Sequence, residues 1–157
     1  MSDKVLFEKT SGRWAVIKEL CLWPVYAGLH RVTRQHLQQG QRQLTVFAFD
    51  HIAHNINLFG VYERAELETF FAWLIAQRPS TLTGTALDVG ANIGNHGLYF
   101  TDYFDHVISF EPNPRTFKIL QLNAELAENM TCVNIGLSDA DGTATLHVDP
   151  SNMGGSS

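Results

Sequence analysis

Residues 85–94 constrain the fold of this chain most strongly, because they combine a short apolar run with a glycine-bearing turn. Residues 86–89 are mostly apolar, which is typical of a strand covered on both faces. Gly90 and Gly94 follow, where a bound molecule could approach the backbone closely. Apolar residues then recur at helical spacing over 95–104, so the turn opens a helix whose free N–H groups face it. We therefore predict the first half of a βαβ unit.

The acid inside this turn narrows the choice of nucleotide. The pattern is D-x-G-x-x-x-G from Asp88, whereas a dinucleotide fold uses G-x-G-x-x-G to rest a pyrophosphate on the helix N-terminus. A carboxylate here would repel a pyrophosphate but suits an ammonium group or ribose hydroxyls. Glu111 lies 23 residues further on, at the end of a second apolar run, and is expected to accept the ribose diol. S-adenosylmethionine carries both groups and is the predicted cofactor.

At these residues the chain resembles the FkbM-type S-adenosylmethionine-dependent methyltransferases. The matching segments are D-V-G-A-N-I-G at 88–94, F-E-P-N-P at 110–114, and V-N-I-G-L-S-D at 133–139 followed by Gly142. The similarity covers roughly residues 60–157. It implies a Rossmann-like fold and O-methylation of a hydroxyl on a small molecule or sugar, neither of which composition shows.

Eight residues are candidates for cofactor binding, and each has a structural alternative. Asp88 could merely cap the following helix, Asn113 could form an Asx-turn, and the two glycines could be ordinary turn residues. Glu63 ends a G-x-Y-E segment that resembles one of the family, but an acid at a helix start is the alternative. No catalytic residue is assigned. The candidates are Glu63, Asp88, Gly90, Asn92, Gly94, Glu111, Asn113 and Asn134.

The histidines carry less information. His51 and His54 are three residues apart, and on a strand that spacing places them on opposite faces, so no metal site is predicted. His96 is expected at the start of the helix after the glycine turn, where its side chain can reach the crevice. A surface position is more common there, and a helix N-terminus disfavours imidazolium, so His96 is left unassigned.

Composition and charge exclude several classes of protein. A chain of 157 residues with 45% hydrophobic and 17% charged content suits one globular domain. The formal charge of −5 argues against nucleic acid as a partner, which requires a clustered basic surface. Two distant cysteines predict neither a disulfide framework nor a metal site, so a cytoplasmic protein is expected.

The first forty residues contain an apolar stretch at 14–29 that two charged residues and Pro24 interrupt. It is too short to span a bilayer and lacks the features of a signal peptide, so no stable membrane insertion is expected. We predict a helix that Pro24 kinks or ends. It packs on the domain or on a partner subunit, with a homo-oligomer as one outcome, and a membrane-surface role stays open.

The remaining elements complete an α/β prediction. Residues 44–49 and 52–58 alternate as a β-hairpin, and 63–77 predict an amphipathic lid helix. A helix at 115–128 and strands at 131–135 and 143–148 follow. The predicted fold is Rossmann-like, with a partial parallel sheet and crossover helices after a helix, a hairpin and a lid helix. We divide it into an extension (1–43), the hairpin and lid helix (44–84) and a cofactor-binding core (85–157) that is incomplete at its C-terminus, since a doubly wound sheet normally has more strands.

Three functions compete at this point. The first is an S-adenosylmethionine-dependent methyltransferase acting on a small-molecule or saccharide hydroxyl. The second is a nicotinamide-dependent dehydrogenase, which Asp88 and the missing G-x-G-x-x-G disfavour. The third is an inactive cofactor-binding fragment or interaction module.

Overall fold

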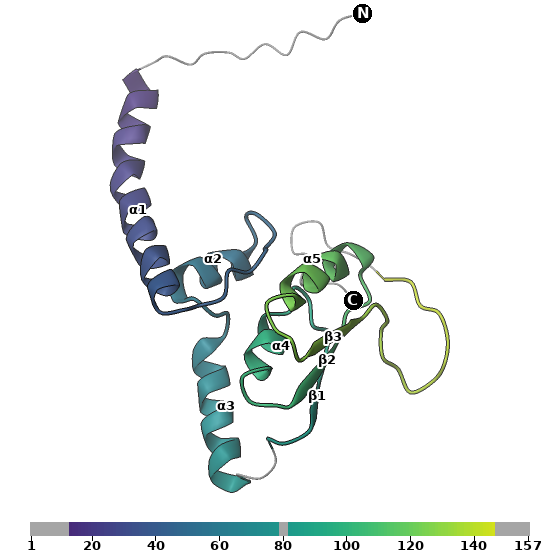
Figure 1. The fold of residues 1–157 in the computed structure, drawn as a ribbon. Coiled ribbons are helices and arrows are strands. Elements are labelled where there is room, and N and C mark those ends of the chain that lie inside the picture. Colours follow the sequence, from purple (N-terminus) through teal and green to yellow (C-terminus); the bar gives the residue numbers. More distant parts are fainter. Residues whose placement is uncertain (1–12, 79–81, 147–157) are drawn as a thin grey trace, which may run out of the picture.

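A computed structural model describes residues 13–78 and 82–146 of the chain (Figure 1). Three parallel strands form its sheet, in the order β1 (Thr85–Val89), β2 (His106–Phe110), β3 (Met130–Val133). Helix α4 (Asn95–Phe100) connects β1 to β2, and α5 (Pro114–Ala124) connects β2 to β3. The chain is therefore an α/β protein with a small parallel sheet, as the apolar runs and the glycine turn predicted.

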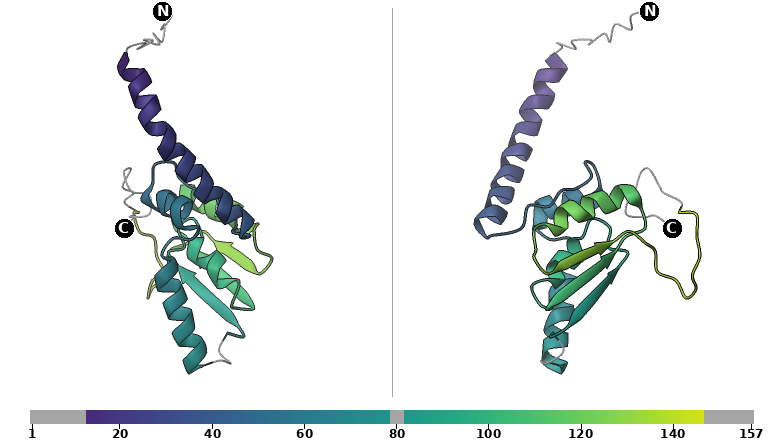
Figure 2. Two further views of the ribbon diagram at one scale, coloured as in Figure 1. Left: turned by 90° about the vertical axis from the view of Figure 1, so that its left-hand side faces the viewer. Right: turned by 45° about the vertical axis from the view of Figure 1, so that its right-hand side comes forward.

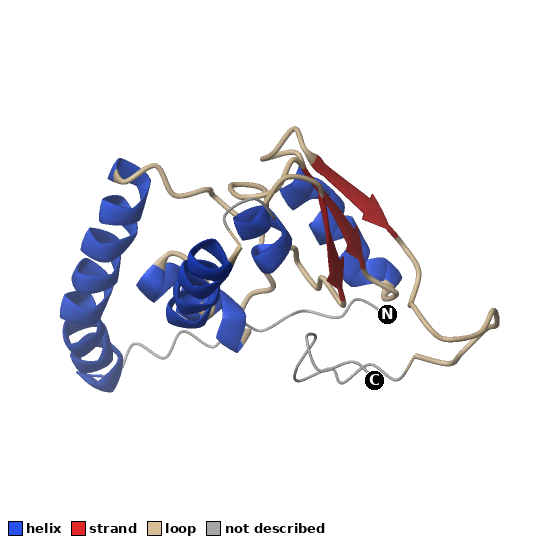
Figure 3. Cartoon of the chain, turned by 90° about the horizontal axis from the view of Figure 1, so that it is seen from below, coloured by secondary structure: helices blue, strands red, loops and turns tan. Residues whose placement is uncertain are grey.

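One face of the sheet is buried and the other is largely exposed. Asp88 on β1 lies beside Ser109 on β2, and both are buried where α4 packs on the sheet. Side chains alternate along a strand, so Leu87 and Val89 point to the other face, where they are 59% and 61% exposed. Seen from below, the three strands lie side by side on one side of the molecule, and α1 lies on the opposite side (Figure 3).

Helix α3 (Arg64–Gln77) packs on the sheet unit through one aromatic side chain. Phe71 is almost fully buried, and its ring stacks on Tyr103 with centroids 4.0 Å apart. The rings of Phe100 and Phe104 also contact it. This aromatic cluster joins α3 to the end of α4 and holds the residues just before α3 near the glycine turn.

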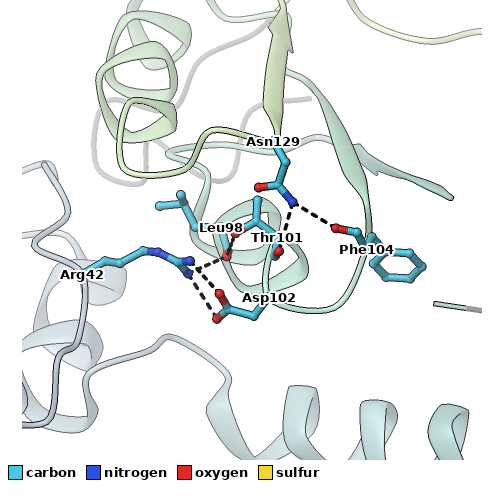
Figure 4. A network of polar contacts seen from close by, with 6 residues as sticks. All are labelled: Arg42, Leu98, Thr101, Asp102, Phe104 and Asn129. Carbon is cyan, nitrogen blue, oxygen red and sulfur yellow. Dashed lines mark hydrogen bonds and ion pairs between the residues drawn. The ribbon is translucent and has the colours of Figure 1, made fainter. Parts of the chain in front are cut away.

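The segment before α2 is tied to the end of α4 by Arg42 (Figure 4). Its guanidinium donates to the Leu98 carbonyl at 2.8 Å and pairs with the Asp102 carboxylate at 2.6 Å. On the other side of this turn, Asn129 donates to the carbonyls of Thr101 and Phe104. Both side chains satisfy carbonyls that a helix end leaves free.

The N-terminal helix α1 spans Arg13–Gln38 and contacts α2 (His51–Phe59). Pro24 lies inside it. Of the two predicted outcomes, a helix that ends at Pro24 is therefore wrong. Over the described residues, no helix combines the length and the apolar character needed to cross a bilayer. Figures 1 and 2 show the N-terminal part of α1 projecting away from the sheet unit.

The predicted β-hairpin is wrong. Its second strand is helix α2, which Asp50 caps by accepting from the Ile52 N–H at 2.8 Å, and which Gly60 ends at φ +84°. Its first strand is irregular, and Phe49 there is 93% exposed with φ +68°. Ile52, Ala53 and Ile56 have helical spacing, and the N-cap acid decides between the two patterns.

The other boundaries shift by a few residues. Helix α3 begins at Arg64, one residue later than predicted, and β3 spans Met130–Val133 instead of 131–135. Helix α5 ends at Ala124 rather than at residue 128. No strand forms over 143–146, so that part of the predicted fourth strand is wrong. Residues 147–148 of that prediction lie outside the described residues.

Candidate functional site

The turn between β1 and α4 has a backbone that only certain residues adopt easily. Gly90 has φ +78°, Asn92 φ +50° and Gly94 φ +88°. Asn tolerates this left-handed region better than most residues with a side chain. A Cβ on Gly94 would lie 2.7 Å from Leu120 Cδ1, whereas no described residue lies within 4 Å of the corresponding position on Gly90. Gly94 therefore allows close packing, and Gly90 leaves open space.

Glu111 holds this turn from behind. Its Oε2 accepts a hydrogen bond from the Asn92 N–H at 2.9 Å, and its Oε1 accepts from the Asn113 N–H at 2.8 Å. The residue is buried. Hydrogen bonds from the Gly90 and Ala91 amides to the Phe110 carbonyl, both 2.9 Å, continue the link. The carboxylate thus joins the two turns that follow β1 and β2.

Asn113 and Asn134 shape the second of these turns. Asn113 Oδ1 accepts from the Arg115 N–H at 3.0 Å and caps α5, which is the Asx-type alternative of the sequence analysis. Asn134 Nδ2 donates to the Glu111 carbonyl at 2.6 Å. Neither side chain lines the pocket beside the glycine turn.

Asp88 lies under α4 rather than in that pocket. The residue is 8% exposed, and its Oδ2 accepts from the Ser109 hydroxyl at 3.3 Å. Burial raises the pKa of this carboxyl, and nearby His96, the Ser109 hydroxyl and a backbone hydrogen bond from Gly97 counter part of that rise. A Cβ on Gly97 would lie 2.8 Å from Asp88 Oδ2, so this glycine lets the helix start approach the acid.

A pocket of about 370 Å³ opens beside the glycine turn. Gly90 and Asn92 line it from the turn, Glu63 from the residues just before α3, and His96 from the start of α4. His96 Nε2 lies 3.1 Å from Glu63 Oε2 and forms an ion pair with it when protonated. His51 from α2 completes the polar wall.

Tyr62 organises this wall. Its ring stacks on the His96 imidazole with centroids 6.2 Å apart, and its hydroxyl lies 3.4 Å from His51 Nε2. Burial and the neighbouring Glu63 carboxylate raise the pKa of the phenol. A phenol that stays protonated can donate a hydrogen bond to a ligand at neutral pH.

Leaving the histidines aside, the charge of the residues that line the pocket is negative. Among its lining residues, all within the described part of the chain, Glu63 is the one acid and none is Lys or Arg. Asn92 Oδ1 is buried and has no hydrogen-bond partner within residues 13–78 and 82–146. Both groups are acceptors, so the pocket favours a ligand that donates hydrogen bonds or carries positive charge.

Two asparagines that the sequence analysis missed position the pocket. Asn95 exchanges two hydrogen bonds with the backbone of Tyr62, at 3.1 and 3.0 Å. Asn123 does the same with Thr45, at 2.7 and 2.9 Å, and also donates to the Ile93 carbonyl at 2.7 Å. Both lie on predicted helices as buried polar residues, but nothing local in the sequence identifies their partners.

The structure gathers three of the eight candidates, Glu63, Gly90 and Asn92, on one pocket wall. The other five lie behind or beside it and support the turns. His96, Tyr62 and His51 join the wall although none was predicted as a site residue, and the false hairpin hid the position of His51. Within the described ranges, no group of three or more His, Cys, Asp or Glu is placed to hold a metal ion.

In α/β proteins, ligands commonly bind at the carboxyl ends of parallel strands, which is where this pocket lies. Residues 88–157 match the model of the methyltransferase FkbM domain. The match begins at Asp88, the last buried residue before the glycine turn.

Two further comparisons give no information about function. No curated protein matches the sequence. The crystal structure of the YcgJ protein from Bacillus subtilis is similar to this chain at 19% identity and a TM-score of 0.35, over 42% of this chain and 29% of that one. The similarity therefore spans less than a third of that protein's length and defines no function.

Proposed function

We propose that the chain binds S-adenosylmethionine in the pocket beside the glycine turn, within a Rossmann-like methyltransferase fold. The observation that carries the proposal is the acceptor character of the pocket. It combines the Glu63 carboxylate with an Asn92 Oδ1 that has no partner among the described residues, and none of the described lining residues is Lys or Arg. A ligand with an ammonium and a sulfonium group suits these acceptors, whereas the pyrophosphate of NAD does not.

The residues present fit this cofactor. The open space at Gly90 allows close approach to the backbone, and Glu63 and Asn92 would receive the ammonium or hydroxyl donors. Glu111 is buried and is not among the described residues that line the pocket. Each of its oxygens accepts one backbone hydrogen bond, so its contribution to cofactor binding would be to hold Asn92 and the glycine turn in place. When bound, the cofactor supplies an electrophilic methyl group.

The reaction that we propose is O-methylation of a hydroxyl on a small molecule or saccharide. It rests on the FkbM domain at residues 88–157 and on the resemblance of the motifs. The contribution of the chain to such a transfer is to hold donor and acceptor in line. No residue is assigned as the base.

Isothermal titration with S-adenosylmethionine, S-adenosylhomocysteine and NAD tests the binding proposal. The first two should bind and NAD should not. Glu63→Gln should weaken binding of S-adenosylmethionine by about tenfold, since losing a hydrogen bond to a charged group costs about 1.5–3 kcal/mol. Glu66→Gln removes an exposed acid in the first turn of α3 and serves as the matched control.

Two results would contradict the proposal. NAD binding as tight as S-adenosylmethionine binding would favour the dehydrogenase alternative. Binding of S-adenosylmethionine without methyl transfer to any of a panel of hydroxylated acceptors would favour the inactive binding module.

A further inference from the structure

Helix α1 carries an apolar segment at residues 20–29 that no other part of the described structure covers. Its five largest exposed members are between 62% and 71% exposed, which is high for apolar side chains on a helix. These residues are Leu20, Leu22, Trp23, Val25 and Tyr26.

The apolar side chains surround the helix instead of forming one stripe. At about 100° per residue, Leu20 and Leu22 lie on opposite sides of the axis, and so do Trp23 and Val25. Pairing with one other helix buries a single stripe. A second copy of α1 would therefore leave much of the segment in water, whereas the boundary between headgroups and acyl chains can receive apolar side chains from more than one side of a helix that lies in it.

The segment also lies where a large surface can reach it. Both views in Figure 2 show the N-terminal part of α1 extending away from the sheet unit, and the contact with α2 lies towards the other end of the helix. Ten residues span about 15 Å, which is about half of the roughly 30 Å hydrocarbon core of a bilayer. The segment is therefore too short to span a bilayer, and a membrane would meet it at the surface.

Basic residues follow the apolar segment directly. Arg31 and Arg34 are both exposed, and no acidic residue occurs between Glu19 and Asp50. This part of the chain is thus basic within a protein of net charge −5. Arginine side chains at this distance from the apolar segment can reach lipid phosphates while their stems stay in the interface.

From these observations we propose that residues 20–29 of α1 bind the surface of a membrane that contains anionic lipids. The apolar side chains enter the boundary between headgroups and acyl chains, with Trp23 and Tyr26 at the level where amphipathic rings are favoured. Arg31 and Arg34 contact the anionic headgroups. The proposal does not depend on the proposed methyl transfer.

Flotation of the full chain with vesicles tests this proposal. The chain should float with vesicles of phosphatidylcholine and phosphatidylserine, less with phosphatidylcholine alone, and less as sodium chloride is raised. Trp23→Ser should reduce the bound fraction by about tenfold, because it removes one large apolar side chain from the interface. Arg31→Glu with Arg34→Glu should reduce it about tenfold on the anionic vesicles.

Trp73→Ser is the matched control, because Trp73 is an exposed tryptophan on α3, and it should leave flotation unchanged. Circular dichroism should show that each variant keeps its helix content. Equal effects of Trp23→Ser and Trp73→Ser, or no flotation of the parent chain, would overturn the proposal. Sedimentation velocity without lipid adds one more outcome: an oligomer that Trp23→Ser dissociates, with no flotation, would assign the segment to a second copy of the chain.

Discussion

The Glu111 carboxylate accepts a hydrogen bond from the Asn92 N–H at 2.9 Å, across 19 residues of sequence. Its other oxygen accepts from the Asn113 N–H. One buried acid thus fixes both the left-handed residue of the glycine turn and the start of α5. The pocket wall at Gly90 and Asn92 depends on this contact, because Glu111 accepts from the backbone of Asn92 itself.

Glu111→Gln should lower the free energy of unfolding by about 1–3 kcal/mol, since an amide cannot accept from both backbone N–H groups and one is left unsatisfied. Chemical denaturation measures this. Glu128→Gln, an exposed isosteric change, should have almost no effect. If the two variants are equally stable, Glu111 does not hold the turns together.

Gly97→Ala should destabilise the chain by about 1–3 kcal/mol, because a methyl group in a filled space forces its neighbours apart. The added Cβ would lie 2.6 Å from Ser109 Oγ and 2.7 Å from Met130 Cε. Gly28→Ala is the matched control: it lies in α1 with nothing within 4 Å of the added carbon, and alanine favours a helix. Thermal unfolding of both variants compares them, and a stable Gly97→Ala would contradict the close packing of α4.

The buried Asp88 carboxyl makes stability depend on pH. Its pKa is raised in the folded chain by burial, so its protonated form contributes stability that is fully present below the unfolded pKa of about 3.9. That contribution is lost as pH rises through the folded pKa. Asp88→Asn cannot ionise and does not lose this contribution. Its free energy of unfolding relative to the parent chain should therefore rise between the unfolded and the folded pKa of Asp88 and stay constant at higher pH. A difference that does not change with pH would contradict the raised pKa.

Asn123→Ala should release the segment around Thr45, because it removes all three hydrogen bonds that join this segment and Ile93 to α5. Each buried group left unsatisfied costs about 1–3 kcal/mol. Limited proteolysis should cut within residues 41–47 faster in this variant than in the parent chain. Asn57→Ala, which removes one hydrogen bond on the exposed side of α2, should leave the cleavage rate unchanged.

The elements that the sequence predicted correctly are those with a strong local signal. The apolar run at 86–89 and the two glycines predicted β1 and its turn, and Asn113-Pro114 is a typical N-cap and first residue of a helix. The hairpin prediction failed because alternation over a few residues competes with a helical pattern in the same segment. Phe49 ends the apolar run of the predicted first strand, yet it is exposed in a turn.

The site was less predictable than the fold because its contacts join distant residues. The bonds from Asn123 to Thr45 cross 78 residues, and those from Asn95 to Tyr62 cross 33. No local pattern encodes such pairs. The sequence interpretation placed Asp88 in the crevice facing the ligand, but the side on which Asp88 lies depends on which face of β1 the helix α4 covers.

Binding of S-adenosylmethionine at the glycine turn can be measured by titrating the isotope-labelled chain and following its amide chemical shifts. We expect saturable shifts that are largest at Gly90, Asn92, Glu63 and His96 and absent from the exposed part of α1. NAD at the same concentrations should shift none of these amides. Shifts that centre on other residues, or that NAD reproduces, would contradict binding at this turn.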